Sequence, residues 1–200
     1  MIIFLSQIFS TMPLSPAVRR KPLHTRTLKL QGYLRDDGLL DIEGHLVDTK
    51  PFAIRNRDRG GQIRAGESLH EMRIRLTLDL DFRIVDAQAV TEWASYDHCQ
   101  GATLSFAGLI GERIGPGWNR RVRSILGGTK GCTHITEMLG QIATTAFQTM
   151  NSLQDPGQPN IDKPEKPVIL DTCFTLATDS PVVARDWPEF YLSEEENKAS

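Results

Sequence analysis

Two stretches in the first half of the chain alternate polar and apolar residues with a period of two. Successive side chains of a β-strand point to opposite sides of a sheet, so this alternation predicts strands with one buried and one solvated face. The apolar positions are Leu40, Ile42, Leu46, Met72, Ile74, Leu76 and Leu78, with Gly44 in the same row. Strands of this kind form an antiparallel sheet with its core on one side.

Turn signals and further alternation complete the predicted sheet. Residues 25–30 and 82–91 predict two more strands, and Asp37-Gly38 predicts a hairpin that returns the chain into the strand over 39–47. The segment 50–66 is rich in Gly, Arg, Asp and Asn, which predicts a loop or an irregular edge.

The second half of the chain predicts helices. Residues 99–110 are small and apolar, as in a buried helix, and residues 119–126 predict a short helix with a basic exposed face. The longest helix is expected over 134–150, where apolar residues recur at helical spacing. The expected fold class is therefore α+β, with an antiparallel sheet from the N-terminal half packed against helices from the C-terminal half.

The chain is expected to form one domain. We place a single α+β domain at residues 23–192, between a disordered tail over 1–22 and another over 193–200. Prolines among polar residues predict a long surface loop over 151–167. The apolar residues before Met12 lack the basic region of a signal peptide, so Met12 is the expected natural start.

Composition narrows the classes of function. A net charge of -2 disfavours binding to nucleic acid through bulk charge, and no segment is long enough to cross a membrane. Three widely spaced cysteines suit a reducing compartment better than a disulfide framework. We therefore expect a cytoplasmic protein with a small-molecule ligand and no nucleic-acid or membrane partner. Its exposed sheet edges would allow a homodimer.

The glycine-rich run Gly127–His134 leads directly into the longest predicted helix. Its glycines allow a tight turn or a close backbone approach. Cys132 and His134 stand at the helix start, where free N–H groups and the positive helix end favour a thiolate. They would serve as metal ligands, as a thiolate with a neighbouring base, or as a buried cysteine beside a capping histidine. Glu137 would orient His134 or complement the helix dipole.

A Cys/His-lined site is the leading hypothesis. Zinc or an iron–sulfur cluster needs about four ligands, and the chain has only three cysteines, so a histidine must join them. The expected metal-binding residues, which would hold zinc or iron, are His70, Cys99, Cys132 and His134. In the same hypothesis the two cysteines act alternatively as nucleophiles. The role of Cys173 stays open.

A second hypothesis is a metal-independent enzyme, of lyase or hydrolase type, that acts on a small organic substrate. Its catalytic residues would be Arg35, Asp37, Asp41, Glu43, His45 and His134. One histidine would act as base and one carboxylate as acid, while Arg35 or Lys50 would hold an anionic group. A third hypothesis is a non-catalytic binding or assembly module, in which the cysteines are buried and the polar motifs are structural.

Six runs of residues carry a resemblance to a known family. They are His24–Arg26, Gly32–Glu43, Leu46–Lys50, Gly66–Met72, Gly127–His134 and Asp171–Cys173. Through them the chain resembles an uncharacterised bacterial family, the domain of unknown function 2889, over about residues 24–191. The resemblance implies no activity. It agrees with Met12 as the start, because the shared pattern begins after that residue.

The chain is also similar to iron–sulfur scaffold proteins of the IscU/NifU type. In those proteins two strands precede a cysteine that opens a helix, as Cys99 does here, and a later cysteine opens a long helix, as Cys132 does. The first scaffold cysteine falls near residues 68–70, where this chain has no thiol. The likeness implies an IscU/NifU-like arrangement, with a site of His70, Cys99 and Cys132 and a fourth group from His134 or Cys173.

Overall fold

A computed structural model describes residues 14–153, 166–167 and 169–193 of the chain. Its contacts divide the chain into two compact units, Met1–Phe147 and Gln148–Ser200. The sequence predicts one domain over 23–192 and gives no sign of the boundary at residue 147, because the longest helix runs across it.

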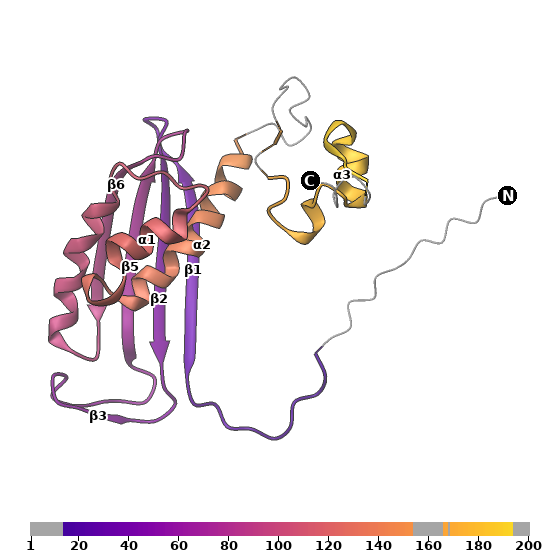
Figure 1. The fold of residues 1–200 in the computed structure, drawn as a ribbon. Helices are drawn as coiled ribbons and strands as arrows, with labels where there is room; N and C mark the ends of the chain where they lie inside the picture. The colour runs from indigo at the N-terminus through magenta and orange to yellow at the C-terminus, as the bar shows by residue number, and fades with distance from the viewer. Residues whose placement is uncertain (1–13, 154–165, 168, 194–200) are drawn as a thin grey trace. The chain divides into compact units, whose positions relative to one another are not determined.

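The first unit is built on a four-stranded antiparallel sheet (Figure 1). Its strands, in spatial order, are β1 Thr25–Leu34, β2 Leu40–Thr49, β5 Ser68–Leu78 and β6 Ile84–Trp93. Gly38 has a φ of 82° in the turn between β1 and β2, a conformation that glycine adopts without steric cost. The predicted strands, the hairpin and the α+β class are confirmed.

The segment 50–66 contains more regular structure than the sequence predicts. Strands β3 Ile54–Asn56 and β4 Gly61–Ile63 pair into a separate two-stranded sheet. Three residues are too few to establish an alternation, so these strands leave no recognisable period in the sequence.

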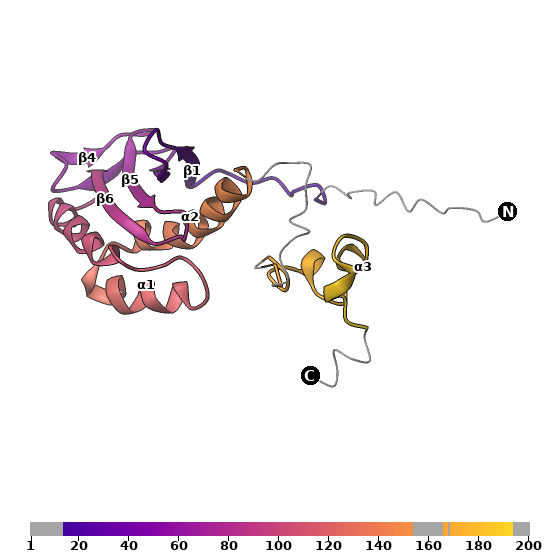
Figure 2. The same cartoon turned by 90° about the horizontal axis from the view of Figure 1, so that it is seen from above.

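Alternate residues of the sheet point to opposite faces, as predicted. The even-numbered side chains Leu40, Ile42, Leu46, Met72, Ile74, Leu76 and Leu78 are buried. The odd-numbered residues of β2 are half-buried and point to the other side, which we call the open face of the sheet. Figures 1 and 2 show α1 and α2 together on one face of the sheet.

Helices α1 Trp118–Leu126 and α2 Thr133–Asn151 form the second layer of this unit. The buried stripe of α2 consists of Ile135, Met138, Leu139, Ile142, Ala143 and Ala146. Trp118 Nε1 donates to the Leu139 carbonyl oxygen at 3.0 Å and ties α1 to α2. A Cβ on Gly44 would stand 3.4 Å from Ile142 Cδ1, so α2 lies directly over β2. Both predicted helices are confirmed.

The predicted buried helix over 99–110 needs correction. Asp97–Leu109 is a 3₁₀-helix, η1, in which Phe106 and Leu109 are buried while Leu104 is 82% exposed. A 3₁₀-helix aligns residues three apart, so it presents a narrow ridge to the core instead of a broad apolar face.

The second unit contains short elements, η3 Phe174–Leu176, α3 Pro181–Asp186 and η4 Pro188–Phe190. Ser180 caps α3 by accepting a hydrogen bond from the Val183 N–H at 3.2 Å. Residues 14–24 form no helix or strand, and most of the predicted loop over 151–167 and of both predicted tails lies outside the described residues. Among the described helices, none has the length and apolar character needed to cross a bilayer.

Candidate functional site

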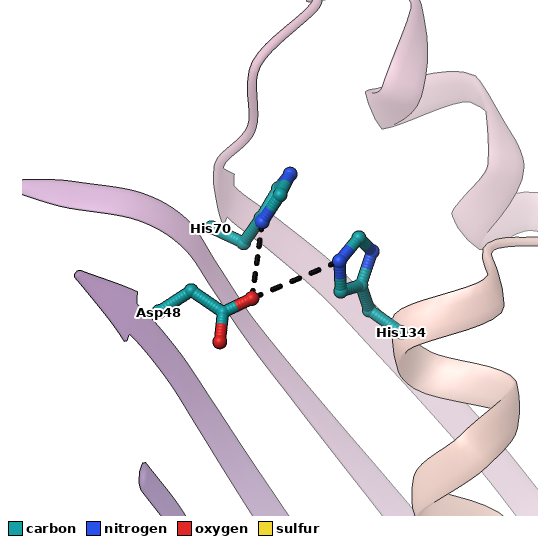
Figure 3. A group of neighbouring side chains, drawn as sticks. All are labelled: Asp48, His70 and His134. Atoms are coloured by element: carbon teal, nitrogen blue, oxygen red, sulfur yellow. Dashed lines mark hydrogen bonds and ion pairs between the residues drawn. The ribbon is translucent and has the colours of Figure 1, made fainter. Parts of the chain in front are cut away.

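A buried carboxylate forms the centre of the candidate site. Asp48 lies near the end of β2 on the helix-facing side, and its side chain is 0% exposed. The strand register places Arg26 of β1 and His70 of β5 directly opposite it, so the three residues form one row across the sheet. His134 reaches the same point from the first turn of α2 (Figure 3).

Three basic side chains hold the Asp48 carboxylate. Arg26 donates from Nε to Oδ1 at 2.8 Å and from Nη2 to Oδ2 at 2.9 Å, a bidentate pair. His24 Nε2 lies 3.1 Å from Oδ1, and His70 Nδ1 lies 3.1 Å from Oδ2. Burial alone would raise the pKa of Asp48, but hydrogen bonds from Arg26 and His70 outweigh it and lower the pKa to about 2. Asp48 is therefore an anion at neutral pH.

Two imidazole rings meet at Oδ2 of Asp48. His70 Nδ1 lies 3.1 Å and His134 Nε2 lies 3.7 Å from that oxygen, and the ring centroids are 4.0 Å apart. Burial lowers the pKa of both histidines. The charge of His70 lowers the pKa of His134 further. The hydrogen bond from His70 to Asp48 acts in the opposite direction and raises the pKa of His70. A lowered pKa favours the neutral ring, the form in which an imidazole nitrogen offers a lone pair.

Each imidazole also has a partner on its outer side. His70 Nε2 lies 3.2 Å from Ser95 Oγ, and His134 Nδ1 lies 3.9 Å from Cys132 Sγ. Each ring therefore presents one nitrogen to Asp48 and the other to a neighbouring hydroxyl or thiol. Such outer partners select the tautomer and the orientation of an imidazole ligand.

The glycine-rich run fixes where α2 begins. A Cβ on Gly127 would lie 2.3 Å from the Arg123 carbonyl oxygen, and a Cβ on Gly131 would lie 2.9 Å from the carbonyl oxygen of the last residue of α1. Gly128, between them, has a φ of 65°. The structure thus shows both the close approach and the turn that the glycines predict. Because the chain passes so tightly around the end of α1, Cys132 and His134 arrive beside Asp48.

The structure brings together part of the predicted metal-binding set. His70 and His134 are neighbours, and Cys132 lies beside His134. The Sγ atom of Cys132 lies 3.7 Å from the Sδ atom of Met72. Among the described residues, the groups whose ligand atoms all lie within 4.8 Å of one another are Asp48–His70–His134 and His45–Glu71–Glu92. Neither group contains Cys99, which is half-buried in η1, and Cys173 is exposed in the second unit.

Of the predicted acid–base residues, Asp41, Glu43 and His45 lie on the open face, while Arg35 and Asp37 lie in the turn between β1 and β2. Their ion pairs are Arg35–Asp37 at 2.6 Å, Arg35–Asp41 at 3.5 Å, Glu43–Arg75 at 2.6 Å and His45–Glu71 at 3.0 Å. Odd-numbered residues of β2 point away from Asp48, so the sheet separates Asp41, Glu43 and His45 from His134.

Sequence reasoning missed the centre of the site and its supports, Asp48, Arg26, His24 and Ser95. A signal for Asp48 was present: the apolar row of β2 continues at every second residue to position 48, where it ends in a carboxylate. A charge on the buried face of a strand requires partners, and their cross-strand positions follow from the hairpin register. Ser95 follows the end of β6 and has no comparable signal.

The comparisons with known proteins support a family assignment. The chain matches the family model described as protein of unknown function (DUF2889) over residues 24–148, which include every residue around Asp48 named above. The match ends before the run Asp171–Cys173, so it is shorter than the resemblance that the sequence predicts. No curated protein and no solved structure matches the chain. Since the family model covers more than half of the 200 residues, the chain belongs to the DUF2889 family of proteins of unknown function.

Proposed function

We propose that the chain binds one divalent transition-metal ion, zinc or iron(II), through Asp48, His70 and His134. The observation that carries the proposal is the convergence of one carboxylate oxygen and two imidazole nitrogens within 4.8 Å of one another. This donor set suits zinc and iron(II), whose sites in proteins commonly combine histidines with a carboxylate.

The spacing of the donor atoms fits an ion of this size. In tetrahedral coordination at about 2.0–2.1 Å, neighbouring donor atoms stand about 3.3–3.4 Å apart. The two separations from Asp48 Oδ2, 3.1 Å to His70 Nδ1 and 3.7 Å to His134 Nε2, lie on either side of that value. Both separations thus differ from the tetrahedral value by a few tenths of an ångström, and the two imidazole nitrogens lie within 4.8 Å of each other.

The surroundings supply what metal ligands need. Arg26 and His24 hydrogen-bond the carboxylate, while Ser95 and Cys132 face the outer nitrogens of the two imidazoles. Partners of this kind usually fix the orientation of the metal ligands in metalloproteins. Cys132 would then be an outer partner of His134 instead of a ligand.

Three protein ligands leave at least one coordination position for water or substrate, which is typical of catalytic and not of structural zinc sites. A bound ion would act there as a Lewis acid or would lower the pKa of a coordinated water. The proposed class is therefore a metal-dependent hydrolase or lyase that acts on a small organic molecule.

The test is metal analysis of full-length protein purified anaerobically without chelator, combined with calorimetric titration of zinc and iron(II). We expect about one equivalent of metal in the wild type and its loss in His134→Ala, which removes a half-buried ligand from a helix start. His98→Ala, which changes an exposed histidine of η1, is the matched control and should retain the metal. Wild-type protein that binds neither metal would refute the proposal, as would full binding by His134→Ala.

A second candidate function uses the same residues without a metal. Ser95 Oγ, His70 and Asp48 form a chain with contacts of 3.2 and 3.1 Å, the arrangement of a nucleophile, a base and an orienting carboxylate. The neutral His70 would take the proton of Ser95 during attack on an acyl or phosphoryl group. A metal on His70 Nδ1 would break this chain, so the two functions exclude each other at any moment.

A fluorophosphonate probe separates the two candidates. In the metal-free function Ser95 Oγ bonds to phosphorus, fluoride leaves and the serine proton passes to His70 Nε2. Intact-mass analysis of chelator-treated protein would then show one adduct, absent in Ser95→Ala and His70→Ala and suppressed by added zinc. Unlabelled protein would eliminate the second candidate and leave the metal proposal standing.

A further inference from the structure

We propose that two copies of the chain form a twofold-symmetric dimer in which their β1 strands pair in antiparallel fashion and join the two sheets. β1 lies at one edge of the four-stranded sheet, and its ten residues pair with β2 without a register shift (Figure 1). In the part of the chain that the structure describes, no other strand pairs with β1. A long, regular edge of this kind is a template for pairing with a strand of another molecule.

The backbone groups of β1 that face the open edge follow from the hairpin. The Arg35 N–H donates to the Leu39 carbonyl oxygen at 2.9 Å and thereby sets the phase of the β1–β2 ladder. Hydrogen-bonded positions of an antiparallel ladder recur at every second residue, so the odd-numbered residues of β1 bond to β2. The N–H and C=O groups of the even-numbered residues, from Arg26 to Leu34, therefore point outward. Within the described residues, none of these groups has a hydrogen-bond partner.

An apolar row on the helix-facing side of the sheet continues to the same edge. Leu28 and Leu34 of β1 lie opposite Leu46 and Leu40 of β2. Leu46 and Leu40 are 2% and 0% exposed, whereas Leu34 is 57% exposed and Leu28 is half-buried. The apolar layer of the core thus reaches the edge strand and is not closed there. A neighbouring sheet that continues this layer would cover both leucines.

A second copy of β1 fits this edge because the strand is complementary to itself. A twofold axis at Gln31 brings the outward groups of Leu28 into register with those of the partner's Leu34, and each such contact occurs twice. Lys29 then lies opposite the partner's Tyr33, and no like charges face each other across the junction. A register centred on Lys29 would instead set two lysines opposite each other, which is destabilising.

The other edge strand, β6, is less suited to pairing. The Gly111 N–H donates to the Ile84 carbonyl oxygen and the Ile84 N–H donates to the Glu112 carbonyl oxygen, each at 2.8 Å, so the first residue of β6 is already bonded. The pairing of β5 with β6 also contains two register shifts. Irregularities of this kind twist an edge and interrupt its row of hydrogen-bonding groups. We therefore assign the interface to β1.

Sedimentation velocity and amide hydrogen exchange of the full chain test the pairing. We expect a species of twice the mass of the 22.4 kDa chain. In this dimer the N–H groups of Leu28 and Leu30 are bonded across the junction, so NMR should show them protected from exchange. The N–H groups of Lys29 and Gln31 point to β2 and serve as internal references, because they should be protected in monomer and dimer alike.

Two leucine variants locate the interface. Leu34→Lys places a charge against the partner's Leu28 twice in each dimer, so we expect the sedimenting species to shift to the monomer and Leu28 and Leu30 to lose their amide protection. Leu80→Lys is the matched control, because Leu80 is 58% exposed against 57% for Leu34 but lies in the turn between β5 and β6. It should remain a dimer. Both leucines are exposed, so both variants should fold, and circular dichroism checks this.

The inference does not depend on the metal proposal, and the His134→Ala variant should remain a dimer. A monomeric wild type with rapid exchange at Leu28 and Leu30 would overturn it. A monomeric wild type in which these amides are protected would show that another segment of the same chain covers β1. A dimer that survives Leu34→Lys, or that dissociates equally in Leu80→Lys, would place the interface on another surface.

Discussion

Asp48 is the residue on which the candidate site depends. It occupies a position that the alternation of β2 assigns to the buried face, yet it carries a charge. Burying an isolated carboxylate is costly, so the fold must surround it with partners, and Arg26, His24 and His70 fill that role. Burial in the same environment lowers the pKa of the two imidazoles.

The Arg26–Asp48 pair should therefore contribute to stability far more than an exposed ion pair does. Arg26→Met leaves the buried carboxylate without its bidentate partner, and we expect the free energy of unfolding to fall by about 2–4 kcal/mol. Urea denaturation followed by circular dichroism measures the change.

Arg35→Met is the matched control for this prediction. Arg35 is about as exposed as Arg26, at 40% against 38%, but its partner Asp37 is 49% exposed while Asp48 is fully buried. Its loss should leave the free energy of unfolding nearly unchanged. Equal effects of the two substitutions would show that burial of Asp48 does not determine the strength of the pair.

At this scale the sequence predicted the two histidines but not their carboxylate. His134 is predicted from its place at a helix start, and His70 is predicted because the expected metal site needs a histidine and the IscU/NifU likeness implies this one. Asp48 is not among the predicted site residues, although counting in steps of two from Leu40 places it on the buried face of β2. Cys99 is predicted as a ligand because it opens the predicted helix over 99–110. The distance between Cys99 and His70 depends on how that helix packs against the sheet, which the sequence alone does not give.

At the scale of elements, the site depends on how tightly α2 follows α1. The connection between these helices passes so close to the end of α1 that Gly127 has no room for a Cβ, which would stand 2.3 Å from the Arg123 carbonyl oxygen. A displaced connection would shift the first turn of α2, and with it His134.

Gly127→Ala should lower the free energy of unfolding by about 2 kcal/mol or more, because the backbone carbonyl cannot move aside as a flexible side chain can. The measurement is thermal or urea unfolding. Gly101→Ala is the control: a Cβ there meets nothing within 4 Å, and alanine in a helical segment should be neutral or slightly stabilising. A Gly127→Ala variant as stable as the wild type would contradict the close approach.

Elements whose apolar residues recur at a regular spacing could be predicted from the sequence, and elements without such a spacing could not. The strands β2 and β5 and the helix α2 each bury one regular face, so their residues alternate or recur visibly. The 3₁₀-helix η1 buries only Phe106 and Leu109, whereas its small apolar residues predict a fully buried helix. Composition indicated a helical segment there but could not give its depth of burial.

For the whole molecule, the family match and the division into units agree. The match ends at residue 148, and the first compact unit ends at residue 147. The sheet, α1, the buried stripe of α2 and every proposed ligand lie in that unit, so the sequence beyond it is not needed for this core.

A shortened chain of residues 14–153, which keeps α2 complete, should therefore fold cooperatively and bind metal with the affinity of the full chain. Circular dichroism, thermal unfolding and the zinc titration described above measure this. A shortened chain that aggregates or binds zinc much more weakly would show that residues beyond 153 support the site.

The ligand set is tested most directly by X-ray absorption spectroscopy of the zinc-loaded full-length protein. A site of Asp48, His70 and His134 predicts a first shell of nitrogen and oxygen at about 2.0–2.1 Å, with outer-shell scattering from two imidazoles and no sulfur. A zinc–sulfur shell at about 2.3 Å would contradict it and would return Cys132 or Cys99 to the role of metal ligand.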